Sequence, residues 1–276
     1  ATMSGFDLRA VARELNEYAG AYVKKAYMPH YEQIVLRINP KDMDQFDLVL
    51  VRGARIYTSN RDRPMPMVPP PFAMVLRKHL KNARMIGVRQ LGFDRVLCFN
   101  FDTKFGQYHL YVEVFRDGNI ILTDAEDTII LPLTHASYAG RTLKKGVTYQ
   151  PPPPAMDPHE IELAHLVEMF ESSDRDLVST LGGKVNLGGT HANAVCALAG
   201  MEPNIDTQVA DAEKVHAALK SLLNDLAESR EGYLLLKPDK ENSNEELESQ
   251  AASHEPNGKR DRFFEQFACE ATPTLL

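Results

Sequence analysis

Cysteine, tryptophan and long apolar runs are scarce or absent in this sequence of 276 residues. Tryptophan does not occur, and the three cysteines, Cys98, Cys196 and Cys269, are too far apart to form a CxxC pair or a Cys/His cluster. We therefore expect neither a metal site nor a disulfide framework, and a reducing cytoplasm is the expected location. No apolar run approaches the roughly 20 residues that span a bilayer. No secretion signal is recognised at the N-terminus either, so we expect no membrane partner.

Sequence motifs of the common enzyme classes are missing as well. There is no Walker A loop, no dinucleotide-binding fingerprint, no HExxH and no GxSxG motif, each of which places defined groups around a reacting centre. The spacing of the carboxylates and histidines pairs none of them. We therefore expect a binding protein that is not an enzyme, has no catalytic residues and needs no small-molecule cofactor.

A run of prolines at 151–154 is the best domain boundary in the chain. At roughly 150 residues per domain, this length suggests about two domains, and a proline run is a typical linker. We expect a first domain over 1–150, an all-helical domain over 151–232 and an acidic segment over 233–276. The stretch 225–256 holds nine acidic and three basic residues, so we expect it to be exposed.

The first domain shows alternating strand and turn signals. A helix is expected over 4–20, and turns at 52–53 and 117–119 separate segments that favour strands. Strands are expected over 33–38, 47–51, 54–58, 95–101, 108–115 and 120–122. The expected fold class is α+β. An N-terminal β-sandwich with flanking helices precedes the helical domain, which includes one long helix over 206–230.

A basic helix is expected from Phe72, because Phe72, Leu76 and Leu80 form an apolar stripe at helical spacing. Between positions 52 and 95 there are ten Lys/Arg and two Asp/Glu, a local charge of about +8 in a chain whose total is −7. A solvated charged face and a polyanion partner both explain this excess, and its size makes the polyanion at least as good an interpretation. The candidate nucleic-acid contacts here are Arg77, Lys78, Lys81, Arg84 and Arg89.

The basic helix leads through a short strand to a turn at Asp94 and Arg95. Such a dipeptide commonly forms a salt bridge or a turn and has no further role. Alternatively, the planar guanidinium of Arg95 can bind a phosphate or a base edge, and Asp94 can orient it or accept a hydrogen bond from a base amine. Asp7, near the start of the first helix, is best explained by residue type alone as an N-cap.

Two glycines, Gly188 and Gly189, indicate a tight turn into a helix over 190–199, which Gly200 closes with a left-handed conformation. Glycines let a backbone approach closely, and free N–H groups at a helix start can face a phosphate. A helical hairpin used only for packing explains the pattern equally well. The side chains expected at a nucleic acid are Lys184, Asn186, Thr190, His191 and Asn193.

Three stretches together, MVLRKHL, QLGFDR and YVEVFRDGNIILTD, strongly resemble the N-terminal part of the NFACT family. Its members include RqcH of bacteria and the NEMF-type factors of eukaryotes, and older naming describes them as fibronectin-binding protein A-like. The resemblance covers nearly the whole chain. It implies a first domain like that of MutM-type DNA glycosylases and a helix–two-turns–helix pattern in the helical domain. The family continues into a coiled coil and a C-terminal RNA-binding domain, so 233–276 would begin a truncated middle region.

The function implied by this resemblance is ribosome-associated quality control. Family members bind tRNA and the large ribosomal subunit obstructed by peptidyl-tRNA, and they promote C-terminal tailing of stalled nascent chains. Peptidyl transfer remains the chemistry of the ribosome. The family's tRNA-binding residues correspond to Asp94, Arg95 and Asp7 of this sequence, so Asp7 can be both a cap and part of a site.

Two other functions remain open from the sequence. A MutM-like DNA-binding or DNA-repair protein is disfavoured, because the Pro-Glu start and the C-terminal zinc finger of those enzymes are missing. A fibronectin-binding surface protein is disfavoured by the lack of a recognised secretion signal. The identity of the partner decides among the three.

Overall fold

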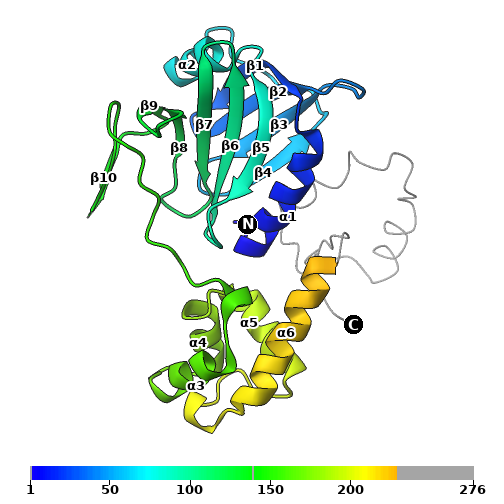
Figure 1. The fold of residues 1–276 in the computed structure, drawn as a ribbon, viewed down its shortest axis with the longest axis vertical. Helices are drawn as coiled ribbons and strands as arrows, with labels where there is room; N and C mark the ends of the chain where they lie inside the picture. The colour runs from blue at the N-terminus through cyan, green and yellow to red at the C-terminus, as the bar shows by residue number, and fades with distance from the viewer. Residues whose placement is uncertain (1, 139, 229–276) are drawn as a thin grey trace, which may run out of the picture.

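The computed structural model describes residues 2–138 and 140–228 (Figure 1). Within these residues, helices and a large antiparallel sheet occur together, which confirms the α+β class. The acidic segment expected over 233–276 lies outside the described residues. The domain limits 1–150, 151–232 and 233–276 stay predictions.

Nine antiparallel strands form one sheet in the order β4-β3-β2-β1-β5-β6-β7-β8-β9. The ladder between β1 and β5 is short, with Tyr22 paired to Arg84, and there the sheet folds back on itself (Figure 1). The first leaf (β1–β4) and the second leaf (β5–β9) enclose one core, so the expected sandwich is a single bent sheet. The strands are β1 (Tyr22–His30), β2 (Gln33–Asn39), β3 (Phe46–Val51), β4 (Arg55–Ser59), β5 (Arg84–Gln90), β6 (Val96–Thr103), β7 (Gly106–Glu113), β8 (Ile120–Asp124) and β9 (Ile129–Pro132).

The core is filled by apolar side chains that occupy every second position along the strands. In β2, Ile34, Leu36 and Ile38 enter the core, while Arg37 between them faces outward, as the two-residue period of a strand requires. The helices α1 (Gly5–Leu15) and α2 (Pro71–Leu80) pack against the same core. Their buried residues recur at helical spacing: Leu8, Val11 and Leu15 from α1, and Phe72, Leu76 and Leu80 from α2.

A third group of buried residues holds the small hairpin of β10 (Ala136–Tyr138) and β11 (Arg141–Leu143) against β7. Glu113 at the end of β7 is fully buried and forms an ion pair with Arg141. Its Oε1 also accepts a hydrogen bond of 3.0 Å from the Tyr149 hydroxyl. A Cβ at Gly118 would lie 2.3 Å from the Glu113 carbonyl oxygen, so this turn requires glycine.

The helical segment contains α3 (Leu163–Glu171), α4 (Leu177–Gly183), α5 (Gly188–Leu198) and α6 (Ala212–Glu228). Leu166, Leu181 and Leu219 are among the residues of its core, which also includes Phe6 and Phe93 from the first part of the chain. Because these two rings enter the helical core, the start of α1 and the β5–β6 turn are fixed against the helices. Gly200, with a φ of 67°, ends α5 in the expected left-handed conformation.

The prediction of one long helix over 206–230 is wrong about where the helix begins. Asp206 begins a 3-10 turn (Thr207–Val209), because its carboxylate accepts a 2.9 Å hydrogen bond from the Gln208 N–H. The α-helix itself begins only at α6, where Asp211 accepts a hydrogen bond from the Lys214 N–H at 3.1 Å. Two aspartates that compete for backbone donors therefore divide the segment.

Candidate nucleic-acid interface

The turn between β5 and β6 displays Asp94 and Arg95 while burying their neighbour Phe93. Gly92 has a φ of 56°, which reverses the chain, and the Phe93 ring meets Phe6 edge-on at a centroid distance of 4.7 Å. A Cβ at Gly5 would lie 2.9 Å from the Phe93 ring, so the close approach of α1 to this turn requires glycine. Phe93 therefore anchors the turn and leaves the next two side chains facing outward.

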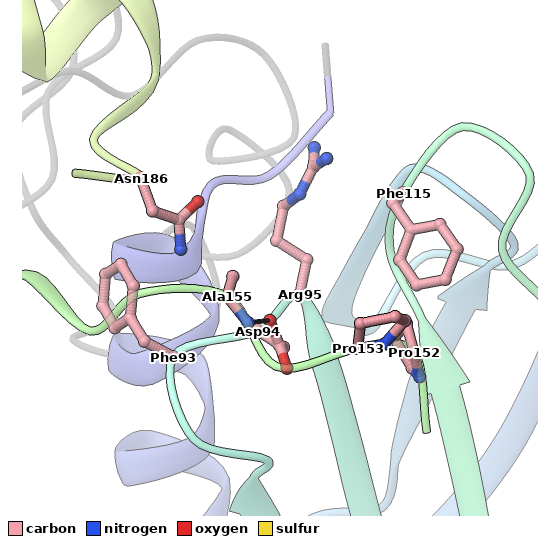
Figure 2. Close-up of a pocket in the computed structure, with 8 residues that line it drawn as sticks. All are labelled: Phe93, Asp94, Arg95, Phe115, Pro152, Pro153, Ala155 and Asn186. Carbon is pink, nitrogen blue, oxygen red and sulfur yellow. Dashed lines mark hydrogen bonds between the residues drawn. The ribbon is translucent and has the colours of Figure 1, made fainter. Parts of the chain in front are cut away.

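Asp94 and Arg95 do not form a salt bridge with each other, because Asp94 bonds to the linker instead. The Asp94 carboxylate accepts a hydrogen bond of 2.9 Å from the Ala155 N–H. Burial raises the pKa of Asp94, and this hydrogen bond opposes the shift. Burial lowers the pKa of Arg95, although a guanidinium stays charged at neutral pH. Within the described part of the chain, the Arg95 side chain has no ion-pair or hydrogen-bond partner (Figure 2).

A cavity of about 170 Å³ opens beside these two side chains (Figure 2). It combines phenyl and proline rings with a carboxylate, a guanidinium and an amide. Asn186, which precedes α5, reaches it with a φ of 63° and donates a 3.0 Å hydrogen bond from Nδ2 to the Met156 carbonyl. The turn, the linker and the helical segment thus meet at one cavity, lined by Phe93, Asp94, Arg95, Phe115, Pro152, Pro153, Ala155 and Asn186.

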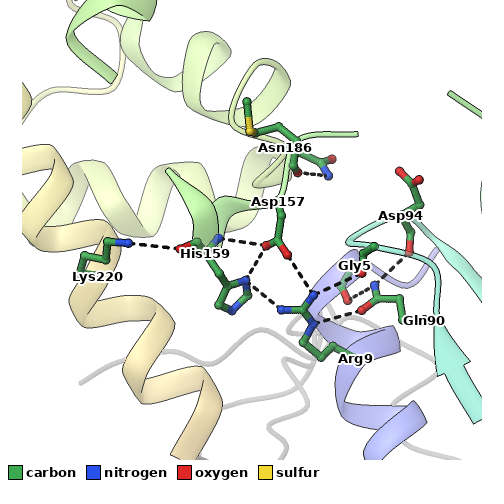
Figure 3. Close-up of polar contacts among 10 residues, drawn as sticks. Gly5, Arg9, Gln90, Asp94, Asp157, His159, Asn186 and Lys220 are labelled. Carbon is green, nitrogen blue, oxygen red and sulfur yellow. Dashed lines mark hydrogen bonds and ion pairs between the residues drawn. The ribbon is translucent and has the colours of Figure 1, made fainter. Parts of the chain in front are cut away.

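Arg9 on α1 connects the turn, the linker and the helical segment (Figure 3). Its guanidinium donates to the Gln90 side-chain oxygen at 3.2 Å and to the Gly92 carbonyl at 3.3 Å. It pairs with Asp157 at 3.2 Å and lies 3.0 Å from His159 Nδ1. Its Cζ also lies 4.8 Å from the centroid of the Phe93 ring beneath it.

The far end of this network reaches α6. Lys220 donates from Nζ to the His159 carbonyl at 3.3 Å. Although burial opposes it, hydrogen bonds from His159 and the charge of Arg9 hold the pKa of Asp157 below its usual range. Arg9 was not singled out in the sequence, yet it bonds both to the β5–β6 turn and to Asp157 and His159 ahead of the helices. A second contact joins α1 to α6 directly, because Arg13 donates to the Ala227 carbonyl at 3.1 Å.

Asp7 is not the N-cap of α1. Ser4 is the cap, and Asp7 completes a capping box, because its Oδ2 accepts the Ser4 N–H at 2.7 Å while the Ser4 hydroxyl accepts the Asp7 N–H at 3.2 Å. Burial raises the pKa of Asp7, and the Ser4 hydrogen bonds and the charge of His191 oppose the shift.

His191 is placed inside the helical core and not on the surface. It is 5% exposed, and its ring lies 4.6 Å from that of Phe6. Its Nδ1 lies 3.2 Å from the Leu187 carbonyl oxygen, and burial lowers the pKa of His191. This position gives it a packing role between α5 and α1.

The remaining candidate residues fall into two groups. Lys184, Thr190 and Asn193 are exposed around the start of α5, and Asn193 Nδ2 donates to the Gly189 carbonyl at 2.8 Å. The basic residues of α2 and β5 are in the sheet part of the molecule, and α2 lies at the end of that part away from the helical segment (Figure 1). In this second group Arg77 donates to the Ala26 carbonyl, Arg84 pairs with Asp102, and Lys78, Lys81 and Arg89 are exposed.

Residues 2–138 and 140–228 contain neither a metal-binding cluster nor a membrane-spanning helix. No group of three or more His, Cys, Asp and Glu side chains is arranged there to hold a metal ion. No helix in the same residues is long and apolar enough to cross a membrane.

The sequence also matches a known protein family and several named proteins. The family described as NFACT N-terminal and middle domains matches residues 4–268. The archaeal Rqc2 homolog aRqcH of Methanocaldococcus jannaschii is 31% identical over 247 residues, which cover 85% of this chain and 37% of that protein. Ribosome quality control complex subunit NEMF of Homo sapiens is 40% identical over 128 residues, covering 46% of this chain and 12% of that protein. The chain therefore spans well under half the length of either relative.

The fold has a counterpart among solved structures. The N-terminal part of the fibronectin/fibrinogen-binding protein from Streptococcus suis superposes with a TM-score of 0.66 at 23% sequence identity. The superposition covers 92% of this chain and all of that one. At this identity the likeness concerns the fold alone.

Proposed function

Because the chain belongs to the NFACT family, we propose that it is the RNA-binding part of a factor in ribosome-associated quality control. The names of its archaeal, human and bacterial relatives support this role. In this proposal the whole protein binds tRNA and the large ribosomal subunit obstructed by peptidyl-tRNA, and it promotes C-terminal tailing of the stalled nascent chain. The ribosome supplies the peptidyl transfer in the cytoplasm, and this chain supplies binding and not catalysis.

The observation that supports tRNA binding most directly is the exposed Arg95 guanidinium at the edge of the cavity. It has no partner among the described residues, so its planar set of donors is available to a phosphate or a base edge. One carboxylate oxygen of Asp94 accepts the hydrogen bond from the Ala155 N–H, and the other oxygen can accept a hydrogen bond from a base amine. The Phe115 ring and the prolines supply apolar walls against which an unpaired base can stack.

The start of α5 supports a phosphate contact next to the same cavity. Gly188 has a φ of 71° and leaves open space where a Cβ would stand. The first N–H groups of the helix have no partner within the helix and favour an anion. Lys184, Thr190 and Asn193 are exposed around this end. The helix–two-turns–helix segment would then bind the RNA backbone while the turn contacts a base.

A binding competition tests the class of partner. The chain is titrated with a tRNA pool, with duplex DNA of equal charge and with immobilised fibronectin, across a series of salt concentrations. Ribosome quality control predicts preferential tRNA binding that weakens with salt and is reduced by Arg95→Ala. A MutM-like protein would prefer duplex DNA, and a surface adhesin would bind fibronectin; either result would replace the proposal.

A further inference from the structure

Cationic side chains from β1, β2 and α2 converge on one tyrosine ring, away from the cavity. Lys25 Nζ, Arg37 Cζ and Arg77 Cζ each lie 5.3 Å from the centroid of the Tyr27 ring. Arg63, from the loop that precedes α2, lies 4.0 Å from Asp47, which is the partner of Arg37. We use the name Tyr27 cluster for the residues Lys25, Tyr27, Arg37, Arg63 and Arg77.

The cluster occupies the outer face of the first leaf. In the strand register Lys25 is directly opposite Arg37, and Arg37 is directly opposite Asp47. The neighbours of Arg37 along β2, Leu36 and Ile38, enter the core instead. Like charges directly opposite each other destabilise a sheet. The pairing of Lys25 with Arg37 is therefore unfavourable unless a negative group lies nearby.

The negative charge within reach does not balance this convergence. Asp47, whose side chain is 5% exposed, accepts two hydrogen bonds from Arg37 at 2.9 and 3.2 Å. Asp62 is the other acid that acts on Arg37 electrostatically. Among the described residues, Arg37 and Arg63 pair with Asp47, while Lys25 and Arg77 form no ion pair. In addition, the Arg63 Nε is buried and has no hydrogen-bond partner among the described residues.

The guanidinium groups are held in place before any ligand arrives. Arg37 is fixed by Asp47, and Arg77 Nε donates a 2.7 Å hydrogen bond to the Ala26 carbonyl, which is neutral and leaves the charge of Arg77 uncompensated. Fixed guanidinium forks match the geometry of phosphate oxygens, and pre-organisation lowers the entropy lost on binding. The single negative charge of a backbone phosphodiester would offset part of this surplus of positive charge.

We propose that the Tyr27 cluster binds a phosphate of an RNA backbone and forms a second RNA contact of this protein. This inference rests on the proposed function and adds a site to it. Lys78 and Lys81 on α2 are exposed and extend the positive surface beyond the cluster. Because α2 lies at the end of the sheet part that is away from the helical segment (Figure 1), the cluster and the cavity would contact separate parts of an RNA surface. Two linked contacts strengthen binding beyond either one alone.

The test uses two substitutions that remove charge without exposing a buried carboxylate. Lys25 is exposed and Arg77 bonds to a neutral carbonyl, so Lys25→Gln and Arg77→Gln leave the Arg37–Asp47 pair intact. The matched control for each single substitution is Lys214→Gln, which removes one positive charge at an exposed pair on α6. Binding to a tRNA pool and to purified large ribosomal subunits is measured across a salt series, with Arg95→Ala alongside and the thermal midpoint of each variant as a check of folding.

The double variant Lys25→Gln/Arg77→Gln is expected to reduce the slope of log affinity against log salt by up to about 2. Loss of the hydrogen bond from Arg77 to the Ala26 carbonyl should lower the thermal midpoint without unfolding the chain. A loss confined to tRNA assigns the phosphate to tRNA, and a loss confined to subunits assigns it to ribosomal RNA. An unchanged slope with both RNAs, or an equal loss with Lys214→Gln, would overturn the inference. If Arg95→Ala weakens binding while the double variant does not, this inference alone fails; if neither does, the proposed function fails with it.

Discussion

Replacing Arg9 by alanine is expected to loosen the contact between the sheet and the helical segment. The substitution removes the pair with Asp157, the hydrogen bonds to Gln90 and Gly92, and the contact with the Phe93 ring. The Arg9 side chain is 41% exposed, so solvent screening reduces the value of its ion pair to less than about 1 kcal/mol. Together with the cation–ring contact and the neutral hydrogen bonds, the expected loss is about 2 kcal/mol.

Urea unfolding measures this loss. At a slope of about 3 kcal/mol per M, the midpoint of Arg9→Ala should fall by about 0.7 M. Arg9→Lys keeps the positive charge but loses the planar guanidinium, so its urea midpoint should lie between those of Arg9→Ala and the unsubstituted chain. Lys214→Ala, at an exposed pair on α6, is the control and should leave the midpoint unchanged. If Arg9→Ala unfolds at the same midpoint as the unsubstituted chain, the network of Arg9 does not hold the two parts together.

Three further predictions concern single side chains. Gly118→Ala should lower the stability by about 3 kcal/mol in urea unfolding, because the new Cβ would meet the Glu113 carbonyl at 2.3 Å; Gly189→Ala, which has open space, is the control and should unfold like the unsubstituted chain. Arg141→Ala should cost about 3–5 kcal/mol, since it leaves the fully buried Glu113 without its ion-pair partner; a cost as small as that of Lys214→Ala would show that Glu113 does not need it. Burial raises the pKa of Asp7, so its stabilising contribution is present below the unfolded pKa near 3.9 and is lost as pH rises through the higher folded pKa. Urea midpoints of Asp7→Asn should therefore gain on those of the unsubstituted chain as pH rises from about 4 to about 6, and a constant difference would refute the assignment.

The regular parts of the fold could be predicted from local signals. The stripe of Phe72, Leu76 and Leu80 predicted α2, and Gly200 predicted the end of α5. β1 was missed because its exposed lysines and Pro29 obscure the alternation, and register shifts between Val23 and Lys25 and between Tyr27 and His30 break the two-residue period. Local pattern is therefore sufficient where one face of an element is uniformly apolar, and insufficient where a bulge changes the period.

The sequence singled out Asp94, Arg95 and Asn186, which line one cavity, but it did not predict how the segments around them assemble. The contacts of Arg9 could not be predicted from residue spacing, because its partners Asp157 and Gly92 are 148 and 83 residues away in sequence. His191 could have been recognised as a core residue, since Leu187, His191 and Val195 recur at helical spacing and all three are buried. A contact between distant segments depends on the tertiary fold, which local periodicity does not encode.

Photocrosslinking tests most directly whether RNA occupies the cavity beside Arg95. A photoreactive phenylalanine analogue replaces Phe115, which lines the cavity, or Val209, which is 76% exposed on the 3-10 turn before α6. The account predicts that a tRNA pool crosslinks at position 115 and not at 209, and that Arg95→Ala abolishes the crosslink. Equal crosslinking at both positions, or crosslinking at 115 that persists in Arg95→Ala, would contradict binding of tRNA through the Asp94–Arg95 turn.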